Sequence, residues 1–156
     1  MIVLGILFYV IGYKVREGFY QTTKLTTEEK AAAKTAAALL AKASAAAVKA
    51  STAWSTLSSN FDTKQLAIQK VGWDTGLSQE EVLGPDGTAT PLKLASERAA
   101  DAATAWNTAA NSVTKANADT ANSESRTAQT ACSTAGESCS AAISITAAAV
   151  TAFNAI

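Results

Sequence analysis

The chain has 156 residues, 13 acidic and 13 basic side chains, 36 alanines and no histidine. Zero net charge argues against a nucleic-acid partner, because such binding needs a basic face that neutralises phosphates. Without histidine the chain cannot build a Ser-His-Asp triad, a histidine-ligated zinc site or a histidine proton shuttle. We therefore predict that the protein is not an enzyme and that it has no catalytic residue, no bound metal and no cofactor.

The first thirteen residues form an uncharged apolar run, which Lys14, Arg16 and Glu17 follow. A helix of that length rises about 20 Å, which is short of the roughly 30 Å hydrocarbon core of a membrane. A cleaved signal peptide is disfavoured, because there is no basic n-region and no small-x-small cleavage site. Two alternatives stay open: a single-pass membrane anchor, or a helix buried against copies of itself or against partner helices.

Residues 1–25 are predicted to be this anchor or assembly helix. Gly5 and Gly12 lie seven residues apart on one helix face, where small residues permit close helix approach, although membrane helices also tolerate glycine without such a role. Lys14 and Arg16 favour the cytoplasmic side for the rest of the chain, and Glu17 weakens that preference. The residues expected to form the assembly helix are Ile2, Val3, Leu4, Gly5, Ile6, Leu7, Phe8, Val10, Ile11 and Gly12.

A long amphipathic helix is predicted over residues 27–58. Thr26 and Glu29 match a capping box, with Thr26 as the N-cap. Lysines cluster on one side of this helix, and the opposite side is mostly alanine. At about 25 cal/mol per Å² an alanine face stabilises weakly for its length, so a lone copy is expected to be marginally stable. The larger residues expected to pack on this face are Leu39, Leu40, Trp54 and Leu57.

Residues 59–90 are predicted to be irregular, because they contain four glycines and a proline. The run from Gly84 to Gly87 is a turn signal. Binding residues often lie on such surface loops, so this region is the candidate recognition surface. Trp73 is its candidate contact residue, whereas Trp54 and Trp106 are expected to lie in the core.

A second long helix is predicted from Thr90, its N-cap, through Pro91 to about Ala135. Gly136 separates it from a short last helix. The residues expected to pack from the second long helix include Trp106 and Val113. The predicted fold class is therefore all-α: an N-terminal apolar helix, then a helical body over residues 26–156 built from a long alanine-rich antiparallel hairpin and a short C-terminal helix.

Cys132 and Cys139 are seven residues apart. In an unbroken helix their Cα atoms would lie about 10.5 Å apart, beyond the roughly 7 Å limit for a disulfide. Either both thiols are free, or the helix breaks at Gly136 and a small disulfide loop closes, which would place the body outside the cytoplasm. The spacing does not fit a redox or metal-binding pair.

The start of the chain resembles a type IV pilin. The run Ile2-Val3-Leu4-Gly5-Ile6 is similar to the apolar start of class IVb pilins, and Gly76-Leu77-Ser78-Gln79 is similar to a later stretch of that group. The resemblance implies assembly through the apolar helix, and the two late cysteines match the pilin C-terminal disulfide. The chain departs from the family at Gly5, where pilins have a glutamate, and no pilin-like β-sheet is predicted after Ser59.

Two functions follow as expectations. The first is a self-assembling structural subunit of an extracellular, pilus-like filament at the cell surface, whose partners are copies of itself. The second is a membrane-anchored, single-pass accessory subunit of a larger membrane complex, such as a respiratory or photosynthetic one, whose partners are other membrane subunits. Both expectations include contact with a lipid bilayer, at least transiently.

Overall fold

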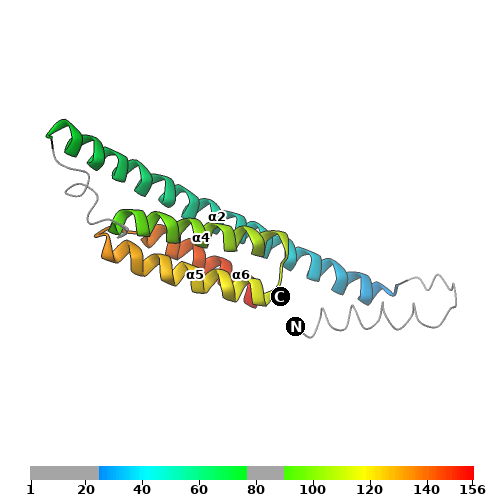
Figure 1. Cartoon of the computed structure of the whole chain (residues 1–156). Helices are drawn as coiled ribbons and strands as arrows, with labels where there is room; N and C mark the ends of the chain where they lie inside the picture. The colour runs from blue at the N-terminus through cyan, green and yellow to red at the C-terminus, as the bar shows by residue number, and fades with distance from the viewer. Residues whose placement is uncertain (1–24, 77–89) are drawn as a thin grey trace, which may run out of the picture.

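The structure, a computed structural model, describes residues 25–76 and 90–156. Four α-helices lie in this part of the chain: α2 (Thr27–Asp74), α4 (Pro91–Asn111), α5 (Lys115–Thr134) and α6 (Ser140–Asn154) (Figure 1). Each helix packs against two others, in the closed order α2, α4, α5, α6 and back to α2. The all-α fold is confirmed, and its arrangement is an antiparallel four-helix bundle.

The helices begin where their capping residues predict. The Thr26 side chain accepts a hydrogen bond from the Glu29 backbone nitrogen at 3.1 Å, and the Glu29 carboxylate accepts one from the Thr26 nitrogen at 2.8 Å. This pair is the predicted capping box of α2. Thr90 caps α4, whose first residue is Pro91, also as predicted.

The predicted end of the first long helix is wrong. α2 continues to Asp74, so residues 59–74 are helical and not irregular. The spacing of three and four residues between core-facing positions runs on through Trp54, Leu57 and Phe61, and no glycine or proline interrupts it before residue 72. The chain leaves the helix through the C-cap Thr75 and then Gly76, whose φ of 75° suits glycine. Residues 77–89 of the predicted loop lie outside the described residues.

The predicted second long helix is two helices. The chain leaves α4 after Asn111 and starts α5 at Lys115, with Thr114 as the new N-cap. No glycine or proline marks this turn. The Asn117 side chain, which a single helix would place on the apolar face, instead donates a hydrogen bond to the Ser112 carbonyl at 2.8 Å and closes the turn.

The core is narrow because alanine fills most of it. The five largest fully buried side chains are those of Trp54, Trp106, Phe61, Cys132 and Ser125. A core in which a cysteine and a serine rank among the largest buried groups removes little apolar area from water per residue. An edge-on contact between Trp106 and Phe153, with ring centroids 6.2 Å apart, crosses the bundle from α4 to α6.

α2 is longer than the bundle that it joins. Figure 1 shows it extending past the other three helices at both ends. None of residues 27–42 is buried, and the buried stripe of the helix starts at Ala43. At the other end Phe61 is the last large side chain of α2 in the core. About a third of this 48-residue helix therefore precedes the bundle core.

Candidate interaction surfaces

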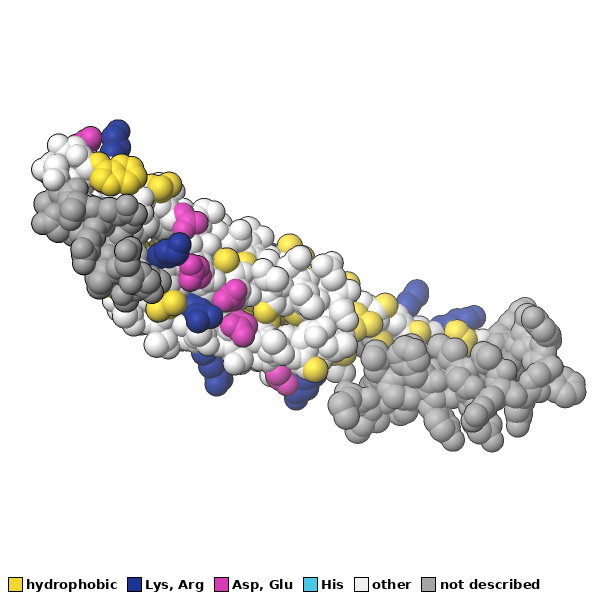
Figure 2. Space-filling view, viewed as in Figure 1, with side chains coloured by type: hydrophobic (Ala, Val, Ile, Leu, Met, Phe, Trp, Pro, Cys, Tyr) yellow, Lys and Arg dark blue, Asp and Glu magenta, His cyan; other side chains and the backbone are white. Residues whose placement is uncertain are grey.

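The part of α2 that follows the core carries large apolar side chains at its surface. Leu66 and Val71 are each 63% exposed, Trp73 is 59% exposed and Ile68 is 49% exposed. Figure 2 shows hydrophobic side chains at the surface near this end of the helix. Leu66 and Trp73 are seven residues apart and share one side of the helix, whereas Ile68 and Val71 lie on the opposite side. We call Leu66 and Trp73 the α2 tail patch. Trp73, the predicted contact residue, therefore lies in solvent on a helix and not on a loop.

The part of α2 that precedes the core is basic. Four lysines of α2 are exposed and form no ion pair with another described residue: Lys30, Lys34 and Lys42 before the core, and Lys49 after Ala43. No acidic residue occurs between Glu29 and Asp62. Leu39 and Leu40, which were predicted to pack, are half-buried here. This segment therefore presents both charge and small apolar side chains outside the core.

The other predicted packing residues lie in or against the bundle core. Trp54 and Trp106 are fully buried, as the amphipathic pattern predicts for tryptophans on apolar helix faces. Leu57 and Val113 are partly buried against the same core. The predicted assembly residues 2–12 lie outside the described residues.

Each buried indole has a hydroxyl partner on another helix. The Trp54 Nε1–H donates to the Thr146 hydroxyl at 3.0 Å, and the Trp106 Nε1–H donates to the Ser125 hydroxyl at 2.9 Å. Ser125 in turn donates to the Ala121 carbonyl at 2.9 Å. Among the described residues no buried side-chain nitrogen or oxygen lacks a partner. Sequence reasoning missed both acceptors, whose signal is a hydroxyl residue at a core position of an otherwise alanine stripe.

A ladder of polar contacts joins α2 to α4 at intervals of seven residues. The Ser44 hydroxyl donates to the Ala110 carbonyl and the Ser51 hydroxyl donates to the Ala103 carbonyl, each at 2.8 Å. One step further, the Ser58 and Ser96 hydroxyls lie 3.1 Å apart. We call these contacts the serine ladder. These contacts between α2 and α4 were not predicted from the sequence.

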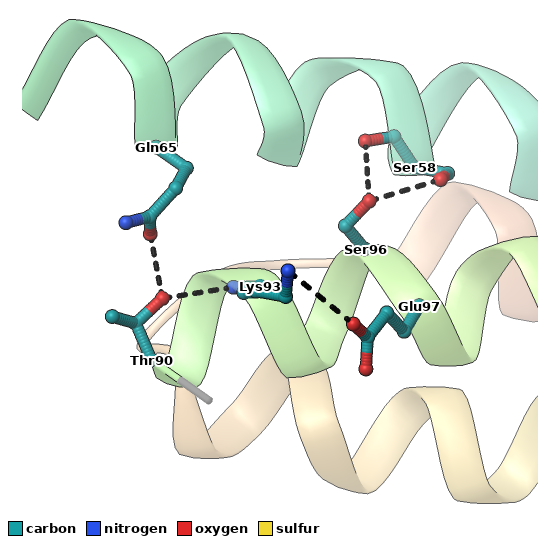
Figure 3. A network of polar contacts seen from close by, with 6 residues as sticks. All are labelled: Ser58, Gln65, Thr90, Lys93, Ser96 and Glu97. Carbon is teal, nitrogen blue, oxygen red and sulfur yellow. Dashed lines mark hydrogen bonds and ion pairs between the residues drawn. The ribbon is translucent and has the colours of Figure 1, made fainter. Parts of the chain in front are cut away.

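The ladder ends where α4 begins (Figure 3). The Thr90 hydroxyl donates to Gln65 Oε1 at 2.7 Å and accepts a hydrogen bond from the Lys93 backbone nitrogen at 3.2 Å. The N-cap of α4 is thereby attached to the buried Gln65 of α2. Lys93 also forms an exposed ion pair with Glu97 at 3.8 Å, which contributes little because both groups are solvated.

Cys132 and Cys139 are free, buried thiols in the structure. Burial, followed by the hydrogen bond and the charge of Cys139, raises the pKa of Cys132 from 9.0 to about 12. A thiol with such a pKa stays protonated at neutral pH, and the thiolate is the nucleophile and the metal ligand. The structure holds both cysteines in the reduced form, so the alternative with a disulfide requires an external oxidant.

The described residues contain no group of three or more His, Cys, Asp or Glu side chains that could hold a metal ion. Two shallow, open hollows flank the turn between α5 and α6, and Glu137 and Ser138 line both of them. Glu137 forms an ion pair with Lys64 of α2. The Lys64–Glu137 ion pair lines one of the hollows, and serine side chains line the other.

By length and composition α2 is the one described helix that is apolar enough to cross a membrane. Core helices of bundles and signal sequences have the same properties. The middle of α2, from Ala43 to Phe61, packs its buried side chains against the other helices of the bundle. Comparison of the chain with protein-family models, with curated proteins and with solved structures finds no match in any of the three.

Proposed function

We propose that this protein is a non-enzymatic structural subunit that self-assembles through its apolar N-terminal segment into an extracellular, pilus-like filament. The observation that supports the proposal most is the length of α2. One continuous helix of 48 residues starts 26 residues into the chain, close to the apolar segment, and enters the bundle core only at Ala43. The first third of α2 therefore lies, in sequence, between the apolar run and the bundle core.

The narrow core supports the same proposal. Alanine seams supply little apolar burial, so the bundle gains stability when further apolar surface is buried between copies. Residues 1–13 are the largest uninterrupted source of such surface in the sequence. Burial of that run between neighbouring copies is the proposed assembly mechanism.

Removal of residues 1–20 tests the mechanism. Filaments sheared from cells without detergent and imaged by negative-stain electron microscopy should consist mainly of this chain, and the deletion variant should yield none. The isolated variant should keep the helical circular dichroism of the four-helix bundle. Polymerisation of the deletion variant would reject the proposal.

The α2 tail patch favours a second candidate, a single-pass accessory subunit of a larger membrane complex. Assembly through the N-terminus does not explain why Leu66 and Trp73 are exposed at the opposite end of α2. Docking on a different membrane subunit would bury these two side chains in the interface. In that case the protein should appear only in detergent extracts of membranes, together with other subunits.

A charge in the apolar run tests the accessory candidate. Gly12→Asp should release the protein from its complex during solubilisation, because a carboxylate within the run opposes burial in lipid or between helices. Gly18→Asp, which lies outside the run, is the matched control and should remain bound. Retention of Gly12→Asp in the complex would exclude this candidate.

A further inference from the structure

The turn between α5 and α6 brings two thiols together. α5 ends in a Schellman motif, in which the Glu137 N–H donates to the Cys132 carbonyl at 2.9 Å and the Gly136 N–H donates to the Ser133 carbonyl at 3.1 Å. Gly136 has a φ of 71°, so the chain reverses direction there. The separation that an unbroken helix would impose on Cys132 and Cys139 is therefore removed.

Both cysteine side chains are directed into the bundle core. Cys132 is fully buried and Cys139 is 7% exposed. Cys139 is the N-cap residue of α6, but its side chain makes no capping hydrogen bond. It instead interacts with the Cys132 thiol. Two neighbouring helices thus place their only cysteines against each other at the same end of the bundle.

We propose that Cys132 and Cys139 form an intramolecular disulfide that joins α5 to α6, and that this bond is made while the chain folds, before the two helices dock. The oxidant is an external disulfide, such as oxidised glutathione or the oxidised active site of a thiol-disulfide oxidoreductase. The structure records the dithiol form of the same site.

The bond forms by two exchange steps. One cysteine thiolate attacks a sulfur of the external disulfide, which forms a mixed disulfide and releases one thiolate of the oxidant. The second cysteine thiolate then attacks the protein sulfur of that mixed disulfide and releases the other half of the oxidant. The protein loses two protons and two electrons, and the external disulfide becomes two thiols.

Burial sets the timing of the reaction. In the folded bundle an external disulfide cannot reach Cys132, which has no exposed surface. The raised pKa of Cys132 also keeps the thiolate concentration low at neutral pH. In the unfolded chain both thiols are accessible, and the pKa of Cys132 returns to about 9.0. The folded protein therefore exchanges one state for the other, dithiol or disulfide, only slowly and through Cys139, which is 7% exposed beside an open hollow.

Refolding the full-length chain tests the proposal. The chain, dispersed in a mild detergent, is denatured with reductant and then refolded in two buffers, one with reduced and oxidised glutathione and one with reductant alone. Each product is alkylated in denaturant and its intact mass is measured. We expect no alkyl groups on the first product and two on the second. The disulfide form should also melt at a temperature several degrees higher, because the closed loop constrains the unfolded chain.

A second measurement tests the timing. Folded dithiol protein is placed in oxidised glutathione and compared with the same protein in denaturant, and we expect the folded form to lose its thiols at least about tenfold more slowly. Equal rates would overturn the timing. Two alkylatable cysteines, or two glutathione adducts, after oxidative refolding would overturn the bond itself. Cys139→Ser controls for assignment, since it should give a glutathione adduct on Cys132 and no internal bond.

Discussion

Hydroxyl groups give the alanine core its specific polar contacts. Ser125 and Thr146 are buried, and each accepts a hydrogen bond from one of the two core indoles. An indole N–H that is buried without an acceptor carries its full desolvation penalty. These two side chains therefore determine where each tryptophan can sit.

Replacing the acceptors should destabilise the fold. Ser125→Ala and Thr146→Val each leave an indole N–H without a partner, and we expect each to lower the free energy of unfolding by about 1–3 kcal/mol. Ser133→Ala and Thr151→Val are the controls of the same residue types. Both hydroxyls are exposed, each donates to the carbonyl four residues earlier, and neither forms a hydrogen bond with an indole of the described residues. Chemical denaturation measures the difference, and equal losses in variants and controls would contradict the assignment.

The Cys132 thiol predicts a pH dependence in reducing buffer. Its folded pKa is about 12 and its ordinary value is 9.0, so above pH 9 the unfolded chain loses a proton that the folded chain keeps. The unfolded state then binds fewer protons, and stability falls as pH rises from 9 towards 12, by about 1.4 kcal/mol per pH unit at most. Below pH 9 this contribution is fully present. Cys132→Ala should lack this component of the slope when denaturation is followed at several pH values.

At the scale of the helices, the serine ladder sets the register of α2 against α4. Alanine faces are nearly uniform, so burial alone distinguishes poorly between neighbouring alignments. The hydroxyls of Ser44 and Ser51 reach carbonyls of α4 at the same distance, 2.8 Å, in successive steps. These directional hydrogen bonds therefore favour one alignment of α2 against α4, which the small apolar side chains alone do not.

Removal of two ladder contacts should weaken the hairpin. We expect Ser44→Ala with Ser51→Ala to lower the free energy of unfolding by about 1–3 kcal/mol, at about 0.5–1.5 kcal/mol per lost bond. Ser55→Ala with Ser59→Ala replaces exposed serines of the same helix, and it should be neutral or slightly stabilising because alanine favours helix. A double variant of the ladder as stable as this control would show that the ladder is dispensable.

The starts of α2 and α4 were predictable from sequence, and two other boundaries were not. Thr26 and Thr90 carry side-chain signals that act within one turn, so local sequence suffices. The extension of α2 past Ser58 depends on core spacing that continues to Phe61 and beyond. The break after Asn111 depends on a five-residue step between Val113 and Ala118, where the spacing elsewhere is three or four. Both features become clear only when the partner helices are known.

At the scale of the whole molecule, the three tryptophans divide into two roles. Trp54 and Trp106 are fully buried and hold the bundle together, whereas Trp73 is mostly exposed beyond it. The amphipathic pattern predicted that division, since the first two lie on alanine faces. It did not predict that Trp73 would lie on the same continuous helix as Trp54, because that depends on the true end of α2.

Substitution of the tryptophans should separate folding from association. We expect Trp54→Ala to lower the free energy of unfolding by about 3–5 kcal/mol, because it empties the largest site in a narrow core. Trp73→Ser should change it by less than about 0.5 kcal/mol, because its side chain is exposed. Denaturation monitored by circular dichroism gives both values. A large loss for Trp73→Ser would mean that the α2 tail patch stabilises the folded monomer.

The seven-residue period of the serine ladder has a mechanical consequence. If α2 slides by one period, about 10.5 Å, towards its C-terminal end, Ser44 comes opposite the Ala103 carbonyl and Ser51 opposite Ser96, whereas Trp54 loses its bond to Thr146. Under a pulling force along the axis of α2, we therefore expect this helix to slide along the bundle in discrete steps of one heptad. The hydrogen bond from the Trp54 indole to Thr146 opposes this sliding and keeps α2 in its observed position.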